Sequence, residues 1–117
     1  MKNYIEKKEI NDWLAKLDKA LKEGTRSRGF VSSLKKYAAL PRRERIAVNL
    51  RKLDKIAKDG EHLIVPGKVL GVGNVSKKFS ISAIEYSGSA IEKLKKSGCN
   101  VISLDEALKA KDARIIV

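Results

Sequence analysis

The sequence has little cysteine, histidine and aromatic content, and each scarcity excludes a class of site. Cys99 is the single cysteine and cannot form a disulfide within the chain. With His62, the single histidine, it provides too few ligands for a metal site built from such clusters. Aromatic residues make up 5% of the chain and do not alternate with basic ones, which argues against stacking of single-stranded bases.

Long apolar runs are also missing: no segment could span a bilayer or act as a signal peptide. With a single cysteine, this indicates a reducing compartment, most simply the cytoplasm. We therefore expect a cytoplasmic protein that uses no cofactor and no metal and has no membrane partner.

A glycine cluster between Gly67 and Gly73 is the best candidate for a nucleotide site, because glycine-rich turns bring backbone amides close to phosphates. Its spacing does not match the known motifs. A phosphate loop needs its lysine after the second glycine, whereas Lys68 follows the first; a dinucleotide fingerprint needs a third glycine where Ser76 stands. We interpret the glycines as tight turns between strands, with close approach to a nucleic-acid backbone as the alternative, and we expect no enzyme and no small-molecule substrate.

Positive charge is what the sequence has in excess. The chain has 26 Lys and Arg against 14 Asp and Glu, a formal net charge of +12 and a pI of about 9.9. Residues 25–58 hold eleven cations and two acids, so three quarters of the excess lies in less than a third of the chain. Few internal ion pairs are possible in such a segment, and phosphates are its natural counter-charge.

Recognition of folded RNA through its shape and backbone fits this composition best, although duplex DNA stays possible on charge alone. Arginine is frequent in the middle of the basic segment, and its planar fork suits contacts with two phosphate oxygens at once. The predicted RNA-binding residues are cations of the basic segment and of the glycine turns: Arg26, Arg28, Lys35, Lys36, Arg42, Arg43, Arg45, Arg51, Lys52, Lys55, Lys68, Lys77 and Lys78.

Helical periodicity dominates the first half of the chain. A capping box at Asn3 and Glu6 begins a first helix, whose apolar stripe continues until Gly24. A second helix is predicted over residues 30–39. A third is predicted from just past Pro41 to about residue 58, with apolar residues on one face and Arg45, Arg51, Lys52, Lys55 and Lys58 on its sides and back.

The second half alternates short strands with turns and helices. The predicted strands are residues 63–65 and 68–70, separated by a tight turn at Pro66 and Gly67, and residues 79–84, 101–102 and 114–117. Helices are predicted from Ser87 or Ser89 to Ser97 and from Ser103 to Lys109. The fold class is therefore α+β: a basic helical arm, residues 1–60, packed on a small α/β unit, residues 61–117, within one domain of residues 1–117.

Several strings of the sequence resemble a known family. They are LIVPGKVLGVG at 63–73, VNL at 48–50 after Pro-Arg-Arg at 41–43, SAIEYS at 82–87 and SAIEKLKKSG at 89–98. Together they resemble the archaeal and eukaryotic ribosomal protein family L eighteen e of the large subunit, in one superfamily with bacterial protein L fifteen.

The resemblance covers the chain from about Phe30 onward, and the short chain looks like the archaeal members. It implies a cytoplasmic protein of the ribosome that acts in translation, binds large-subunit ribosomal RNA, adjoins other ribosomal proteins and has no catalytic residues. It also implies RNA-facing residues at 41–43 and 67–68. Two other readings stay open: a basic DNA- or RNA-binding accessory protein outside the ribosome, and a small nucleotide-binding enzyme.

Overall fold

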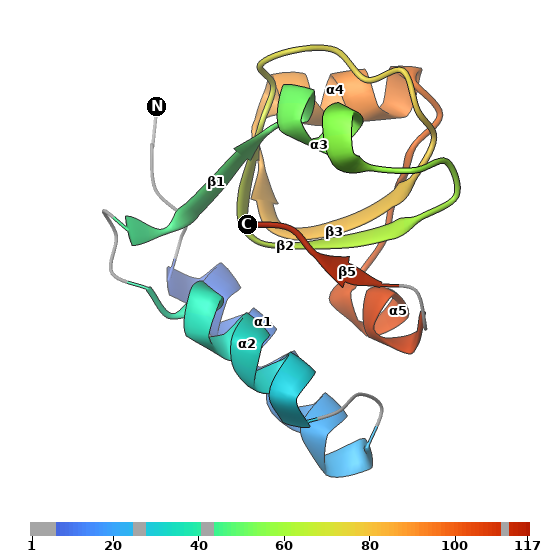
Figure 1. The fold of residues 1–117 in the computed structure, drawn as a ribbon. Coiled ribbons are helices and arrows are strands. Elements are labelled where there is room, and N and C mark those ends of the chain that lie inside the picture. Colours follow the sequence, from blue (N-terminus) through green and yellow to red (C-terminus); the bar gives the residue numbers. More distant parts are fainter. Residues whose placement is uncertain (1–6, 25–27, 41–43, 111–112) are drawn as a thin grey trace.

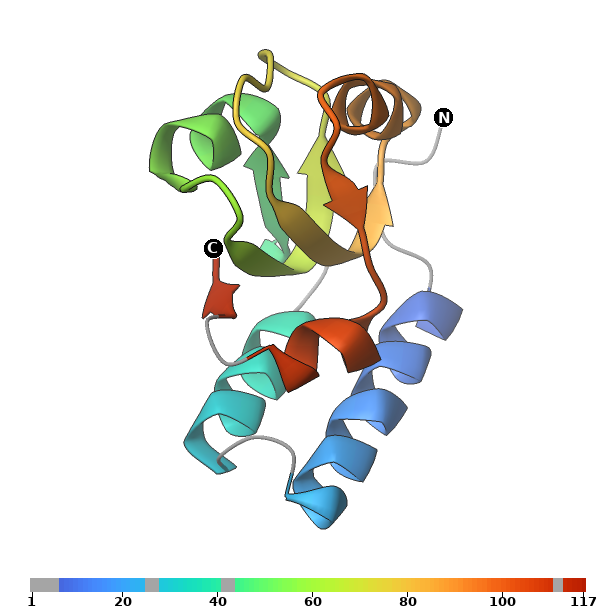
Figure 2. The same cartoon turned by 90° about the vertical axis from the view of Figure 1, so that its right-hand side faces the viewer.

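A parallel sheet lies between two layers of helices (Figure 1). The computed structural model describes residues 7–24, 28–40, 44–110 and 113–117. In chain order the elements are α1 (Lys7–Glu23), α2 (Arg28–Ala38), β1 (Ile46–Asn49), α3 (Leu50–Ile56), β2 (His62–Leu70), β3 (Ser80–Tyr86), α4 (Gly88–Lys96), β4 (Asn100–Val101), α5 (Leu104–Lys109) and β5 (Arg114–Ile115). Helices α1, α2 and α5 cover one face of the sheet, and α3 and α4 cover the other (Figure 2).

Strand β2 is the centre of the sheet. The strand order is β1-β2-β3-β4, and every pairing among the described strands is parallel. One edge of β2 pairs with β3, and the other is shared by β1, opposite residues 67–70, and β5, opposite residues 63–64. The nine-residue strand β2 therefore pairs along one edge with both β1 and β5, which are far apart in the sequence.

The predicted tight turn at Pro66 and Gly67 is wrong, because β2 runs through both residues. Its pairing with β3 shifts register between Val65 and Lys68, so the proline, which has no amide hydrogen to donate, lies at an irregularity of the ladder. Gly67 is needed for another reason: a Cβ atom there would lie 2.1 Å from the carbonyl oxygen of Ile46 in β1.

The predicted third helix is wrong for residues 46–49, which form β1, and right for Leu50–Ile56, which form α3. Apolar residues at 46, 50, 53 and 57 also fit a helical spacing, and for this reason the spacing predicts a helix that includes residues 46–49. The backbone of residues 46–49 instead pairs with β2, a partner that is distant in sequence. Arg45 therefore precedes a strand and does not lie on a cationic helix.

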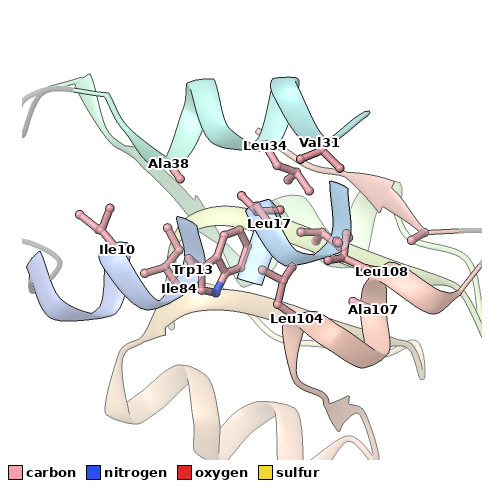
Figure 3. Packing of buried hydrophobic residues seen from close by; sticks show 13 residues of the cluster. Ile10, Trp13, Leu17, Val31, Leu34, Ala38, Ile84, Leu104, Ala107 and Leu108 are labelled. Carbon is pink, nitrogen blue, oxygen red and sulfur yellow. The ribbon is translucent and has the colours of Figure 1, made fainter. Parts of the chain in front are cut away.

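Helices α1 and α2 bury the apolar stripe that the sequence predicts. Leu17 and Leu34 are fully buried, and Trp13 is 6% exposed, so Trp13 is a packing residue. Figure 3 shows these side chains against Leu104 and Leu108 of α5. The predicted capping box at residues 3 and 6 lies outside the described residues, and α1 ends before Gly24, whose φ of +70° is in the left-handed region.

Serine caps begin the last two helices, as the sequence predicts. The Ser87 hydroxyl accepts a hydrogen bond from the Ala90 amide at 3.2 Å, and the Ser103 hydroxyl accepts one from the Glu106 amide at 3.3 Å. Of the two alternatives for α4, Ser87 is therefore the cap. The two strands predicted over residues 63–70 are the single strand β2. The other strands of the second half lie within two residues of their predicted positions, and the α+β class is confirmed.

Candidate nucleic-acid interface

The connecting loop, residues 71–79, leads from β2 to β3 along α3 and α4, from their first turns to their last (Figure 1). A Cβ atom at Gly71 would lie 2.0 Å from the Ser89 hydroxyl oxygen of α4. A Cβ atom at Gly73, where φ is +97°, would lie 2.7 Å from the Arg51 Cβ of α3. The close approach that these glycines permit is therefore between parts of the protein itself.

Lys93 of α4 holds the start of the connecting loop. Its ammonium donates to the carbonyl oxygens of Gly71 at 2.7 Å and Gly73 at 2.8 Å. Between these, the Arg51 amide donates to the Val72 carbonyl oxygen at 3.0 Å. Three successive carbonyl groups are thus held by the two helices, and the Lys93 charge is used inside the fold.

Two acids hold the far end of the connecting loop. The Asp54 carboxylate accepts hydrogen bonds from the Ser76 amide at 2.8 Å and the Lys77 amide at 3.2 Å, and the Asp59 carboxylate accepts one from the Lys78 amide at 2.9 Å. The bond from the Ser76 amide holds the pKa of the Asp54 carboxyl below its ordinary value of 3.8. Both carboxylates therefore bind backbone amides of the loop, and neither forms a direct ion pair with a described Lys or Arg.

A basic face lies on the α3 and α4 side of the sheet. Among the described residues, seven cations on this side make no ion pair and no side-chain hydrogen bond. All are exposed except Lys77, which is half-buried. We call this set the basic face: Arg51, Lys55, Lys58, Lys77, Lys78, Lys95 and Lys96.

The predicted RNA-binding residues are divided by the fold. Arg51, Lys52, Lys55, Lys77 and Lys78 lie together on the α3 and α4 side, where the Lys52 ammonium also donates to the Val117 carbonyl oxygen. Lys68 is half-buried on β2.

The other predicted cations lie elsewhere. Arg28, Lys35 and Lys36 are on α2, across the sheet, and Lys35 pairs with Asp18 of α1 at 2.5 Å. The Arg45 guanidinium donates to the Leu40 carbonyl oxygen at 3.3 Å. Arg26, Arg42 and Arg43 lie outside the described residues.

Sequence reasoning missed Lys95 and Lys96. Residues 59–117 have a low net charge, which hid the lysines of the string EKLKK at 92–96. Only the packing of α4 beside α3, on one face of the sheet, adds them to the basic face (Figure 2).

Two side chains with nucleophilic atoms, Cys99 and Tyr86, have raised pKa values. Burial raises the pKa of the Cys99 thiol, which is 7% exposed, and raises the pKa of Tyr86 to about 12. Within the described ranges, no three His, Cys, Asp or Glu residues lie close enough to hold a metal ion. None of the helices in that part of the chain is long and apolar enough to cross a membrane.

Comparison with known proteins gives a family and several relatives. The family that comprises the ribosomal proteins 50S-L15 and 50S-L18e, with a counterpart from the 60S subunit, matches residues 13–102. The "Large ribosomal subunit protein eL18" of Thermoplasma volcanium is 51% identical over 69 residues, which are 59% of this chain and 57% of the relative. That of Thermoplasma acidophilum is 50% identical over 68 residues, 58% of this chain and 57% of the relative.

A third relative, of the same printed name and from Archaeoglobus fulgidus, is 39% identical over 71 residues, 61% of each chain. The chain thus spans less than two thirds of the length of these relatives. The resemblance drawn from residues 41–98 is confirmed. Because the family match covers more than half of the sequence, the chain belongs to the ribosomal protein family of 50S-L15, 50S-L18e and their 60S counterpart.

Proposed function

We propose that this chain is a structural constituent of the large ribosomal subunit that binds and stabilises folded ribosomal RNA through its basic face. The observation that carries this proposal is the charge balance of the α3 and α4 side of the sheet. Residues 50–60, 71–79 and 88–98 hold nine Lys or Arg and three Asp or Glu, and the seven cations of the basic face make no ion pair with any described residue, so this side lacks negative counter-charge. Phosphates of a folded RNA supply it, and their condensed counterions are released on binding.

Family membership supports the ribosomal part of this proposal, and the names of the eL18 relatives support the large subunit. We propose in addition that the chain adjoins other ribosomal proteins, acts as one domain over residues 1–117, and works in the cytoplasm without catalysing a reaction. An accessory protein that binds DNA or RNA outside the ribosome is the alternative on charge alone.

The test is sedimentation of the tagged protein with ribosomes through a high-salt gradient, followed by binding to purified large-subunit RNA. Migration with large subunits is expected. Affinity for the RNA should fall about a thousandfold between low and moderate salt if roughly six phosphates are contacted. Preference for duplex DNA over ribosomal RNA, or an affinity that hardly changes with salt, would contradict the proposal.

A further inference from the structure

Val72 is an apolar side chain held in solvent beside the basic face. It is 54% exposed, more than Val101 at 39% or Val117 at 41%, the other exposed large hydrophobic residues of the described chain. Its neighbours are glycines, so nothing covers it from either side along the chain. Asn74, two residues further, is exposed as well.

The backbone that carries Val72 is fixed before any partner binds. Lys93 holds the carbonyl oxygens of Gly71 and Gly73, and Val72 itself accepts from the Arg51 amide. The loop is therefore already ordered when a partner contacts this tip. Binding does not reduce the conformational entropy of the loop, so this unfavourable contribution to the binding free energy is absent. An exposed valine on a rigid, cation-flanked tip indicates a contact surface with a partner that is anionic and partly apolar.

We propose that the tip formed by Val72 and Asn74 docks in the minor groove of an A-form RNA duplex, an inference that rests on the proposed function. That groove is wide and shallow and displays ribose rings and 2′-hydroxyl groups between two rows of phosphates. Val72 packs against the ribose surface, the Asn74 amide hydrogen-bonds a 2′-hydroxyl, and Arg51 contacts a phosphate at the rim.

Other nucleic acids fit this tip less well. The minor groove of B-form DNA is about half as wide as its major groove and has no 2′-hydroxyl groups. Single strands are bound by stacking on aromatic side chains, and Phe79, the aromatic residue of the connecting loop, is only 2% exposed. Groove shape, the 2′-hydroxyl groups and the lack of an exposed aromatic residue in the connecting loop thus favour an RNA duplex as the occupant, and Arg51 and Lys55 of α3 supply positive charge for its phosphates.

The first experiment replaces one exposed valine at a time, Val72→Ser or Val101→Ser, and measures affinity for an RNA hairpin with a perfect duplex stem at fixed ionic strength. Val101 is the matched control, because it is an exposed valine on β4. Val72→Ser should weaken RNA binding about fivefold and Val101→Ser should leave it unchanged. Affinity for a DNA hairpin of the same sequence should not respond to Val72→Ser.

If the unmodified protein binds ribosomal RNA but the two variants have equal affinities, the docking of Val72 is wrong and the proposed function stands. An unmodified protein that does not bind ribosomal RNA would end the proposed function itself. Equal losses on RNA and DNA hairpins would show that Val72 contacts a feature shared by both duplexes, which also overturns the A-form proposal.

The second experiment tests the fixed backbone with Lys93→Met and, as a control, Lys19→Met in α1, outside the basic face. Each variant loses one positive charge, but only Lys93 binds the loop carbonyls. Lys93→Met should lose several-fold more RNA affinity, and the Arg51 amide should exchange its hydrogen faster. Equal losses in affinity would overturn the role of the held loop; if Lys93→Met does not fold, the Val72 comparison decides the proposal alone.

Discussion

The two sides of the sheet, counted with the connecting loop, have equal numbers of cations and differ in their acids. Residues 7–23, 28–38 and 104–109, which form α1, α2 and α5, hold nine Lys or Arg and six Asp or Glu. On the opposite side, residues 50–60, 71–79 and 88–98 hold nine and three. In the first layer Asp18 pairs with Lys35, whereas Asp54 and Asp59 on the other side accept from backbone amides. The number of acids therefore decides which side of the sheet carries the larger excess of positive charge.

The largest effect should come from breaking the contact between the connecting loop and α4. Gly71→Val would place side-chain atoms where the Ser89 hydroxyl and the Ala90 amide now lie. We expect the free energy of unfolding to fall by about 3 kcal/mol, measured by urea denaturation. The matched change in the other layer is Gly29→Ala in α2, where a Cβ meets nothing within 4 Å, and it should be stabilising by up to about 1 kcal/mol. Similar effects of the two changes would mean that the loop is not tightly packed.

The comparison of charge is sharpened by two triple variants that each remove three cations. One changes Arg51, Lys55 and Lys95 of the basic face to Gln, and the other changes Lys16, Lys19 and Lys22 of α1 to Gln. The first should weaken binding to large-subunit RNA roughly ten- to a hundredfold more than the second and lower the salt slope by about 2. Filter binding at several salt concentrations measures this, with circular dichroism to show that both variants are folded. Equal losses would indicate a uniformly basic surface with no defined binding face.

A smaller effect is expected from Asp54→Asn, which weakens the acceptor of the Ser76 and Lys77 amides. The free energy of unfolding should fall by roughly 1 kcal/mol at neutral pH. Since the pKa of Asp54 is depressed in the folded state, its contribution is fully present above the ordinary value of 3.8 and is lost as the pH falls through the lower folded-state value. Relative to buried strand amides, the Ser76 amide of the unmodified protein should lose protection from hydrogen exchange as the pH falls from 3.8 through the lower folded-state pKa of Asp54. A variant that keeps the same pH dependence would show that another group is responsible.

The smallest effect should come from Asp18→Asn, which breaks the ion pair with Lys35 between α1 and α2. Both side chains are substantially exposed, so water screens the pair and the change in unfolding free energy should stay within about 0.5 kcal/mol. Thermal unfolding at low and high salt measures it. A loss as large as that of Asp54→Asn would remove the contrast between acids that bind cations and acids that bind the loop.

Local signals were sufficient for much of the fold. Ser103 caps α5 as predicted because the cap and the amide it binds are three residues apart. Trp13 and Leu17 lie on one stripe of α1 because a helix repeats every 3.6 residues, so their burial follows from spacing alone. The candidate site was predicted only in part: Arg51 and Lys55 belong to the basic face, whereas Lys95 and Lys96 join it from another segment.

The sequence by itself determined the α+β class, the apolar faces of α1 and α2, the serine caps and the family. The tertiary structure alone decided that residues 46–49 are a strand, because their hydrogen-bond partners are residues 67–70 of β2. It also decided the role of Lys93. In the sequence this residue is one more cation, but in the structure its ammonium binds the carbonyl oxygens of Gly71 and Gly73. In both cases the deciding partner is roughly twenty residues away along the chain, and local patterns describe only what a residue does with its near neighbours.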